Sequence, residues 1–405
     1  MSSFTPYQRR LFVFLSVAAF FEGYDFMALS QILPNLRADM GLSEGAGGWL
    51  VSVIGIGTIA AYGIIRLADR WGRRRTLMLT ILGYATFTLL TGFAQTAWDF
   101  AAFQLLARVF LIAEWALSMV IAAEEFPAER RGFAIGVIQA SVAFGSILCA
   151  AVTPVLLTTA YGWRSVYFVG VAPLLILAYA RRNLRETERF VRHQKQSGVE
   201  RRRLTDIFRT AWRKRVLQIA LIWGFTYMCT LNAVTFWKEF AVAERGMTDG
   251  QVGSAIAIAS LVSLPLVFLV GKLLDGWGRR PGAVVVYVAL ATSVVGAYQL
   301  HGYWLLTASL TAAIFAVAAV PAVLNAFTTE LFPTGMRGDA FAWSNNLLGR
   351  FGYVIAPVLV AQAAASIGWG QAVSFTAVFA LAALGLILWF LPETSRRELE
   401  ETAAA

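Results

Sequence analysis

The stretch LADRWGRR, residues 67–74, occurs a second time in this chain as LLDGWGRR, residues 273–280. The aspartates of the two copies, Asp69 and Asp275, are 206 residues apart. An unrelated pattern, Phe-Pro-x-x-x-Arg-Gly, repeats at the same spacing at residues 126–132 and 332–338. Two patterns that share one spacing indicate that the chain is a duplication of a unit of roughly 200 residues.

Apolar residues dominate both copies, since 58% of the chain is hydrophobic and 14% is charged. They form runs of roughly 20 residues, the length that crosses the hydrocarbon core of a bilayer. Because every backbone amide must be paired inside lipid, these runs predict helices. We therefore predict an all-α integral membrane protein with twelve transmembrane helices, six in each copy. The runs are residues 11–33, 46–66, 75–95, 99–123, 132–157, 163–180, 216–238, 251–274, 281–301, 303–330, 339–362 and 369–391.

Basic residues divide the loops into two classes. About 28 of the 34 Lys and Arg residues lie in alternate loops on the side of both termini, and such loops face the cytoplasm. This predicts a multi-pass protein of the cell inner membrane with both termini in the cytoplasm. Loops beside anionic headgroups also explain the net charge of +10, so we expect no nucleic-acid partner. The predicted parts are an N-terminal bundle (1–180), an Arg-rich cytoplasmic link (181–215) and a C-terminal bundle (216–405).

Both repeated patterns resemble signatures of the major facilitator superfamily, and the resemblance covers almost the whole chain. Pro392-Glu393-Thr394 is also similar to the ending common among the sugar-porter-like branches of that superfamily. The resemblance implies two six-helix bundles related by a pseudo-two-fold axis along the membrane normal. It further implies that the bundles rock about a substrate site near the midplane.

The repeated loops predict a gate on the cytoplasmic side. Gly271 permits close helix packing, Asp275 can cap or pair at a helix end, and Arg279 and Arg280 can reach carboxylates of the adjoining bundle. The first copy departs from this pattern because Ile65 stands where the second has Gly271. An alternative is that these loops only anchor the topology. The predicted gating residues are Asp69, Arg73, Arg74, Glu124 and Arg131, together with Gly271, Asp275, Arg279, Arg280, Glu330 and Arg337.

Glu22 and Asp25 place two acids in the first apolar run. Ionisable groups at membrane depth are costly and mark ion or substrate pathways. Their separation of three residues puts both on one helix face, where repulsion and desolvation favour proton binding by at least one of them. The run Glu22–Asp25 also resembles the Asp-Gly-Phe-Asp signature of aromatic-acid/proton symporters. We predict proton coupling here; solvation near a helix end or a structural salt bridge is the alternative.

Arg108 and Glu114 are the charges of the fourth run. Arg108 stands where the superfamily often begins an Arg-x-x-x-Gly-x-Gly pattern, and the resemblance implies a role in proton transfer or in pairing with an acid of the first run. Ile112 and Glu114 replace the two glycines of that pattern. Six residues along a helix turn Glu114 about 120° away from Arg108, so Glu114 needs another partner or a place in the substrate cavity.

Arg350 is the buried cation predicted for the C-terminal half. Asn346 lies four residues earlier on the same helical face, so the two side chains can together hold a carboxylate. The alternative is a structural salt bridge to the other half. Tyr227 in the seventh run and Asn325, which follows Pro321 in the tenth, are assigned to the wall of the substrate cavity.

These residues predict a secondary transporter that moves a small organic solute, preferably an organic or aromatic carboxylate, by proton symport. The Gly-Pro-x-x-Gly-Gly motif of drug antiporters is absent, although the acids of the first half also suit proton-coupled exchange or efflux of organic cations. A receptor on the same fold is the alternative from another class. We expect no enzyme, because no phosphate-binding Gly-x-x-x-x-Gly-Lys-Ser/Thr motif is present. With only two histidines, no cofactor or metal is expected. The expected state is a monomer.

Overall fold

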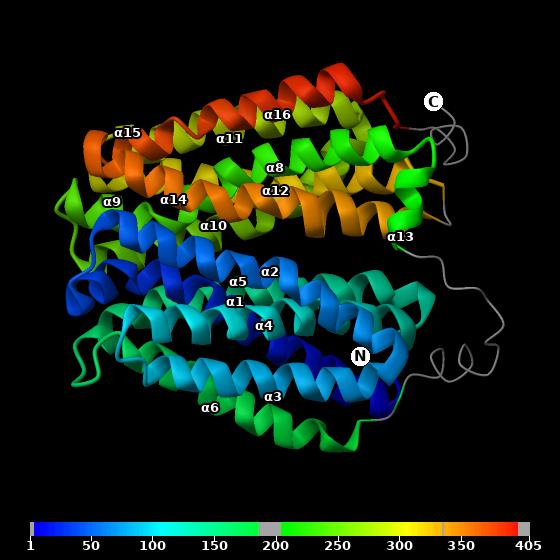
Figure 1. The fold of residues 1–405 in the computed structure, drawn as a ribbon, viewed down its shortest axis with the longest axis horizontal. Helices are drawn as coiled ribbons and strands as arrows, with labels where there is room; N and C mark the ends of the chain where they lie inside the picture. The colour runs from blue at the N-terminus through cyan, green and yellow to red at the C-terminus, as the bar shows by residue number, and fades with distance from the viewer. Residues whose placement is uncertain (1–3, 185, 187–203, 334–335, 396–405) are drawn as a thin grey trace. The chain divides into compact units, whose positions relative to one another are not determined.

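The computed structural model describes residues 4–184, 186, 204–333 and 336–395. Its residues fall into two compact units, one of 1–40 and 53–201 and the other of 41–52 and 202–405. The helices up to residue 183 are α1 (Pro6–Met40), α2 (Glu44–Trp71), α3 (Arg73–Gly92), α4 (Ala97–Glu125), α5 (Ala128–Leu157), α6 (Arg164–Ala180) and η1 (Arg181–Asn183). Those that follow are η2 (Leu204–Arg209), α8 (Arg213–Thr235), α9 (Trp237–Ala243), α10 (Asp249–Trp277), α11 (Arg279–Gln299), α12 (Tyr303–Glu330), α13 (Arg337–Phe341), η4 (Ala342–Gly349), α14 (Arg350–Ile367), α15 (Trp369–Ser374) and α16 (Ala377–Phe390). Figure 1 labels most of them.

Within the described residues, ten helical segments are long and apolar enough to cross a membrane. α6 is shorter, and α3 is less apolar because it begins with three arginines and carries several threonines. Each of the twelve apolar runs coincides, to within about three residues at its ends, with one of these helices or with two or three consecutive ones. The predicted all-helical, multi-pass architecture is therefore confirmed.

Glycine fixes the same helix boundary in both units. Gly72 separates α2 from α3 and Gly278 separates α10 from α11, each with a φ of 102°. Only glycine adopts that backbone conformation without strain. The sharp break between consecutive helices, with two arginines directly after it, is thus a repeated structural element.

Close helix packing positions α1 against α5 in the first unit. A Cβ atom on Gly23 would lie 1.9 Å from the carbonyl oxygen of Val142, and one on Gly145 would lie 1.7 Å from that of Phe20. The second unit packs α8 against α14 in the same way, since a Cβ atom on Gly352 would lie 2.0 Å from the carbonyl oxygen of Gly224. No larger residue fits at these positions without moving a helix.

Candidate functional site

The acids of α1 are buried in the first unit. Glu22 and Asp25 are each 3% exposed, and Arg108 of α4 is 4% exposed. Asp25 interacts electrostatically with Arg108, whose guanidinium lies 4.9 Å from the ring centroid of Phe26. Among the described residues, both carboxylate oxygens of Glu22, Oδ2 of Asp25 and Nη1 of Arg108 have no hydrogen-bond partner. The structure therefore brings the three predicted proton-coupling residues to the interior with unused hydrogen-bonding capacity.

Hydrogen bonds to neighbouring helices hold this part of α1 in place. The hydroxyl of Tyr24 donates to the carbonyl of Val166 at 3.0 Å, and that of Tyr84 donates to the carbonyl of Phe21 at 3.1 Å. Together with the glycine contact to α5, these bonds fix the rotation of α1. The rotation of α1 therefore directs the side chains of Glu22 and Asp25 into the interior of the unit.

Glu114 pairs with Arg181, the first residue of the predicted link. Its carboxylate forms an ion pair with Nη1 of Arg181, and both side chains are almost completely buried. The hydroxyl of Thr80 donates to the other carboxylate oxygen at 2.5 Å, and Nη2 of Arg181 donates to the carbonyl of Phe14 at 2.9 Å. Arg181 follows α6 directly, so its long side chain extends back into the bundle. The sequence signal for this contact is that Arg181 directly follows the apolar run 163–180, from where its long side chain can reach into the bundle.

Arg350 of α14 is half-buried, and not fully buried as predicted, and it lies among aromatic side chains in the second unit. Its guanidinium carbon is 5.0 Å from the ring centroid of Tyr227 and 5.3 Å from that of Tyr353. Trp223 stacks on Tyr227 with 5.2 Å between centroids, and Nε of Arg350 has no hydrogen-bond partner among the described residues. A guanidinium with free donors beside aromatic rings can bind a carboxylate while the rings contact a planar group.

The asparagine in this cluster differs from the predicted one. Residues 342–349 form a π-helix, and the hydroxyl of Tyr227 donates to Oδ1 of the buried Asn345 at 2.8 Å. The α-helical spacing used for the sequence predicts Asn346 beside Arg350, but the wider π turn changes which face each residue occupies. Asn346 is half-buried, so Asn345 is the residue that this spacing missed.

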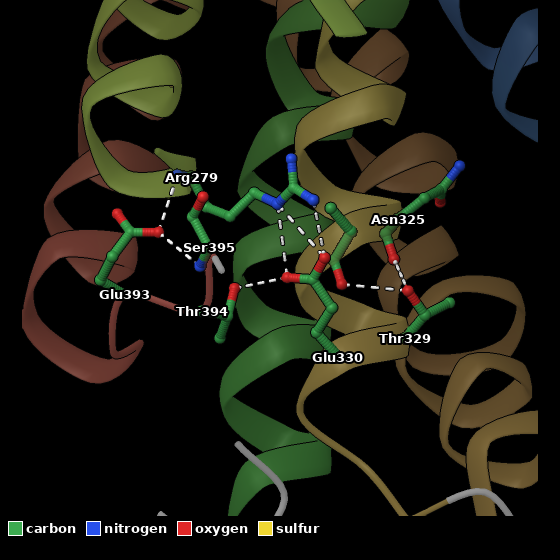
Figure 2. Close-up of polar contacts among 8 residues, drawn as sticks. Arg279, Asn325, Thr329, Glu330, Glu393, Thr394 and Ser395 are labelled. Atoms are coloured by element: carbon green, nitrogen blue, oxygen red, sulfur yellow. Dashed lines mark hydrogen bonds and ion pairs between the residues drawn. The ribbon is translucent and has the colours of Figure 1, made fainter. Parts of the chain in front are cut away.

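Asn325 lies elsewhere on the second unit. Its side chain is exposed on α12, and its backbone carbonyl accepts a hydrogen bond from the hydroxyl of Thr329 at 2.8 Å. Figure 2 shows its amide pointing away from the ion pair between Arg279 and Glu330. The structure therefore does not bring Asn325 to the cluster around Arg350.

The helix ends that carry the repeated loops, here called the basic ends, contain matching ion pairs. Arg73 at the beginning of α3 lies 3.5 Å from Glu124 at the end of α4. In the second unit Nη2 of Arg279 lies 2.9 Å from Glu330, which also accepts a hydrogen bond from the hydroxyl of Thr394 at 2.5 Å (Figure 2). Each acid belongs to the same unit as its arginine, whereas the sequence predicts acids of the adjoining bundle as partners of Arg279 and Arg280.

A second acid at each basic end caps the helix after the glycine break. Glu186 accepts hydrogen bonds from the backbone N–H groups of Arg73 and Arg74, the first at 2.8 Å. Glu393 accepts from the backbone N–H groups of Arg279 and Arg280 at 2.8 and 2.9 Å. A carboxylate at a helix N-terminus satisfies unpaired donors and complements the helix dipole.

The remaining predicted gating residues are distributed as follows. The side chain of Arg131 donates to the carbonyl of Phe126 at 3.5 Å, and Nε of Arg337 donates to that of Phe332 at 3.0 Å. Nη2 of Arg74 donates to the carbonyl of Arg182 at 2.9 Å, and Nη2 of Arg280 donates to that of Leu388 at 2.5 Å. Asp69, Gly271 and Asp275 lie on α2 and α10, but these three residues are outside the part of the chain whose side chains the structure describes.

Glu393 has a shifted pKa. Partial burial acts to raise the pKa of this carboxyl, but backbone N–H donors, with that of Arg280 first among them, outweigh the effect and hold it below its usual range. Glu393 lies beyond the end of α16, so this carboxyl is outside the membrane-spanning helices, at the basic end of the second unit.

Two overlapping segments of the chain, residues 15–248 and 232–405, match the model of the Major Facilitator Superfamily. The chain belongs to this superfamily. It is therefore a membrane transporter and not an enzyme, and the predicted fold of two six-helix bundles is confirmed.

Relatives of this major facilitator protein include transporters of organic acids. It is 29% identical to the probable 4-methylmuconolactone transporter of Cupriavidus pinatubonensis, over 99% of this chain and 94% of that protein. It is 26% identical to the cis,cis-muconate transport protein of Acinetobacter baylyi, over 91% of each chain. It is 24% identical to the gallate transporter of Pseudomonas putida, over 91% of this chain and 88% of that protein.

Solved structures show the same fold for this major facilitator protein. A D-xylose-proton symporter superposes with a TM-score of 0.77 at 18% identity, over 96% of this chain and 99% of that one. The nucleoside transporter NupG superposes with a TM-score of 0.79 at 14% identity, over 94% of this chain and all of that one. Such low identities establish the architecture and leave the substrate to be argued from the site.

Proposed function

We propose that this transporter carries a small organic carboxylate, preferably one with an aromatic or other planar conjugated group, together with protons. The observation that carries the proposal is Arg350, whose guanidinium lies beside the rings of Tyr227 and Tyr353. Relatives named for methylmuconolactone, muconate and gallate support the same class of solute. A carboxylate at Arg350 gains charge-assisted hydrogen bonds, and a planar group gains contact with the tyrosines.

Asp25, Glu22 and Arg108 are proposed as the proton-coupling residues. Burying an ionised carboxylate without a partner costs several kcal/mol, so each acid is stabilised by a proton or by a counter-charge. Arg108 supplies one such charge to Asp25, while the free oxygens of Glu22 leave a place for a proton. Gain and loss of a proton at α1 thereby changes the charge inside the first unit, which is what coupling to a proton gradient requires.

The basic ends are proposed to face the cytoplasm of the cell, with both termini on that side and the protein in the inner membrane. Arginine-rich loops at these ends support this orientation. The ion pairs Arg73–Glu124 and Arg279–Glu330 join consecutive helices within a unit and keep each helix pair rigid during alternating access. Asp69, Gly271 and Asp275 remain predicted members of the gate.

Reconstitution into proteoliposomes tests the function. We expect counterflow and uptake with aromatic and conjugated carboxylates, and none with sugars or organic cations. Uptake should be driven by a proton gradient, acidic outside, and should fall to equilibration when a protonophore collapses that gradient. Faster counterflow with organic cations than with carboxylates would reject the carboxylate class and favour the alternative of cation exchange or efflux. Binding without any counterflow would favour a receptor.

The variant Asp25→Asn separates coupling from binding. We expect it to retain counterflow but to lose accumulation against a gradient, because neutral Asn cannot exchange a proton. Glu44→Gln, at the beginning of α2, removes a carboxylate elsewhere and serves as the matched control. Accumulation that persists in Asp25→Asn, or that survives the protonophore, would reject proton coupling through this residue.

A further inference from the structure

The first unit contains a second group of buried charges besides Asp25 and Arg108. Glu114 of α4 and Arg181 at the end of α6 are both 0% exposed and form an ion pair. The hydroxyl of Thr80 and the carbonyl of Phe14 complete the set of contacts, so four helices contribute to one polar cluster. A buried ion pair has no net advantage over apolar packing for stability alone, and its presence therefore suggests another role.

Glu22 adds a second carboxylate to this cluster. It interacts electrostatically with both Glu114 and Arg181, yet neither of its oxygens has a hydrogen-bond partner among the described residues. Nε of Arg181 is likewise buried without a partner. Glu22 and Glu114 thus both interact electrostatically with Arg181, and Nε of Arg181 is a hydrogen-bond donor that remains unused.

We propose that Arg181 is a counter-ion shared by Glu114 and Glu22, and that it sets the proton affinity of Glu22. When Glu22 carries a proton, Arg181 pairs with Glu114 as seen here. When Glu22 releases its proton, the cluster gains one negative charge, and the guanidinium turns its free donor towards Glu22 while Thr80 continues to hold Glu114. The hydrogen bond from Arg181 to Phe14 links this exchange to α1. This inference rests on the proposed proton coupling.

Of the other titratable groups around this part of α1, Tyr84 and Cys149 have polar contacts, whereas the hydroxyl of Tyr167 is buried with no hydrogen-bond partner among the described residues. The hydroxyl of Tyr84 donates to the carbonyl of Phe21, and the thiol of Cys149 lies 3.7 Å from the hydroxyl of Thr153. The charged or titratable groups around this part of α1 come from six elements. They are Tyr84 on α3, Arg108 and Glu114 on α4, Cys149 on α5, Tyr167 on α6 and Arg181 on η1, with Tyr24 and Asp25 on α1 itself. Because Arg108 acts electrostatically on Asp25, Arg181 is the cation left to neutralise Glu22.

Opposite shifts in the pH profile of uptake test this assignment. In Glu114→Gln, Arg181 is left with Glu22, which favours the ionised form, so half-maximal uptake should move by about one unit towards lower pH. In Arg181→Gln the counter-ion is absent while Glu114 remains, so half-maximal uptake should move by about one unit towards higher pH. The double variant Glu114→Gln/Arg181→Gln removes both opposing influences, and its profile should fall between those of the two single variants. Replacing both members of a buried pair is also the change that best preserves folding.

Two further variants make the result specific. Glu22→Gln should abolish both shifts, because no carboxylate remains for Arg181 to influence. Glu124→Gln, at the end of the same helix, also loses an arginine partner and should leave the pH profile unchanged. If Arg181 and Glu114 only stabilise the fold, these variants would lower the melting temperature without opposite shifts. That outcome would overturn the proposal.

Infrared spectroscopy distinguishes failure of this inference from failure of the proposed function. The carboxyl band of protonated Glu22, identified by its loss in Glu22→Gln, can be titrated in reconstituted protein without transport. The same opposite shifts in that titration would support the shared counter-ion even if uptake proved independent of protons. Unshifted titrations in a protein whose uptake is proton-driven would reject the counter-ion and leave the proposed function standing.

Discussion

The two units agree at their basic ends and differ in their interiors. Arg73 and Glu124 of the first unit correspond to Arg279 and Glu330 of the second at the 206-residue spacing. Away from these ends, by contrast, Glu22 and Asp25 correspond to Met228 and Leu231, and Arg350 corresponds to Phe144. The duplicated contacts join helices, which both units require. The charged residues Glu22, Asp25 and Arg350 occur in one unit only, so these positions are the ones to examine for function.

The largest effect is expected at Arg350. Arg350→Gln should weaken binding of a carboxylate substrate by about 3 kcal/mol, roughly a hundredfold in Kd, because it removes a charge-assisted partner. Arg350→Lys should recover part of this loss, since it keeps the charge without the planar fork. Kd for the purified protein is the measurement, and Phe144→Leu at the corresponding position of the first unit is the control. An unchanged Kd in Arg350→Gln would show that the carboxylate binds elsewhere.

A smaller effect is expected from the repeated ion pairs, and it should be unequal. Glu330 accepts from Nε and Nη2 of Arg279 at 3.2 and 2.9 Å, whereas Arg73 approaches Glu124 at 3.5 Å. Glu330→Gln should therefore lower stability by about 2 kcal/mol and Glu124→Gln by about 0.5–1 kcal/mol. Melting temperatures followed by tryptophan fluorescence in detergent provide the comparison. A larger decrease for Glu124→Gln would contradict this ranking.

The smallest effect is expected from Glu393, whose pKa is lowered by backbone donors at the N-terminus of α11. A lowered pKa in the folded state stabilises the fold above the ordinary value of 4.5, and this contribution disappears as the pH falls through the folded value. Glu393→Gln should thus cost about 0.5 kcal/mol at pH 7, a small amount because the side chain is partly solvated.

The pH dependence of this small difference is the test for Glu393. The gap in melting temperature between Glu393→Gln and the unmodified protein should narrow below about pH 4.5, where the unmodified side chain takes up a proton. Glu186→Gln, which removes the corresponding carboxylate of the first unit, gives the parallel measurement. A gap that widens on acidification would show that Glu393 does not act through its charge.

Much of the fold could be predicted because its signals are local or repeated. Apolar runs of membrane-spanning length predicted the helices, and the 206-residue spacing predicted which loops correspond. Burial of Glu22, Asp25 and Arg108 followed from their positions in the middle of such runs. In each case the property depends on helix periodicity and length, which a single sequence carries.

Other parts of the site depend on geometry that the periodicity does not encode. In the π-helix at residues 342–349, Asn345 bonds to Tyr227, whereas the spacing of an ordinary α-helix selects Asn346. Arg181 pairs with Glu114 because an arginine side chain is long enough to reach back from a helix end. Register changes and long flexible side chains are therefore where the prediction from sequence was incomplete.

The second arginine after each glycine break, Arg74 or Arg280, donates a hydrogen bond to a main-chain carbonyl. Arg74 donates to that of Arg182 and Arg280 donates to that of Leu388, again at the 206-residue spacing. Every residue has a backbone carbonyl, so the two acceptor positions do not need the same side chain. The contact is therefore present in both units although residues 182 and 388 differ in the sequence. Positions 182 and 388 are thus equivalent attachment points for a matched pair of spectroscopic labels, since a cysteine at either leaves the acceptor unchanged.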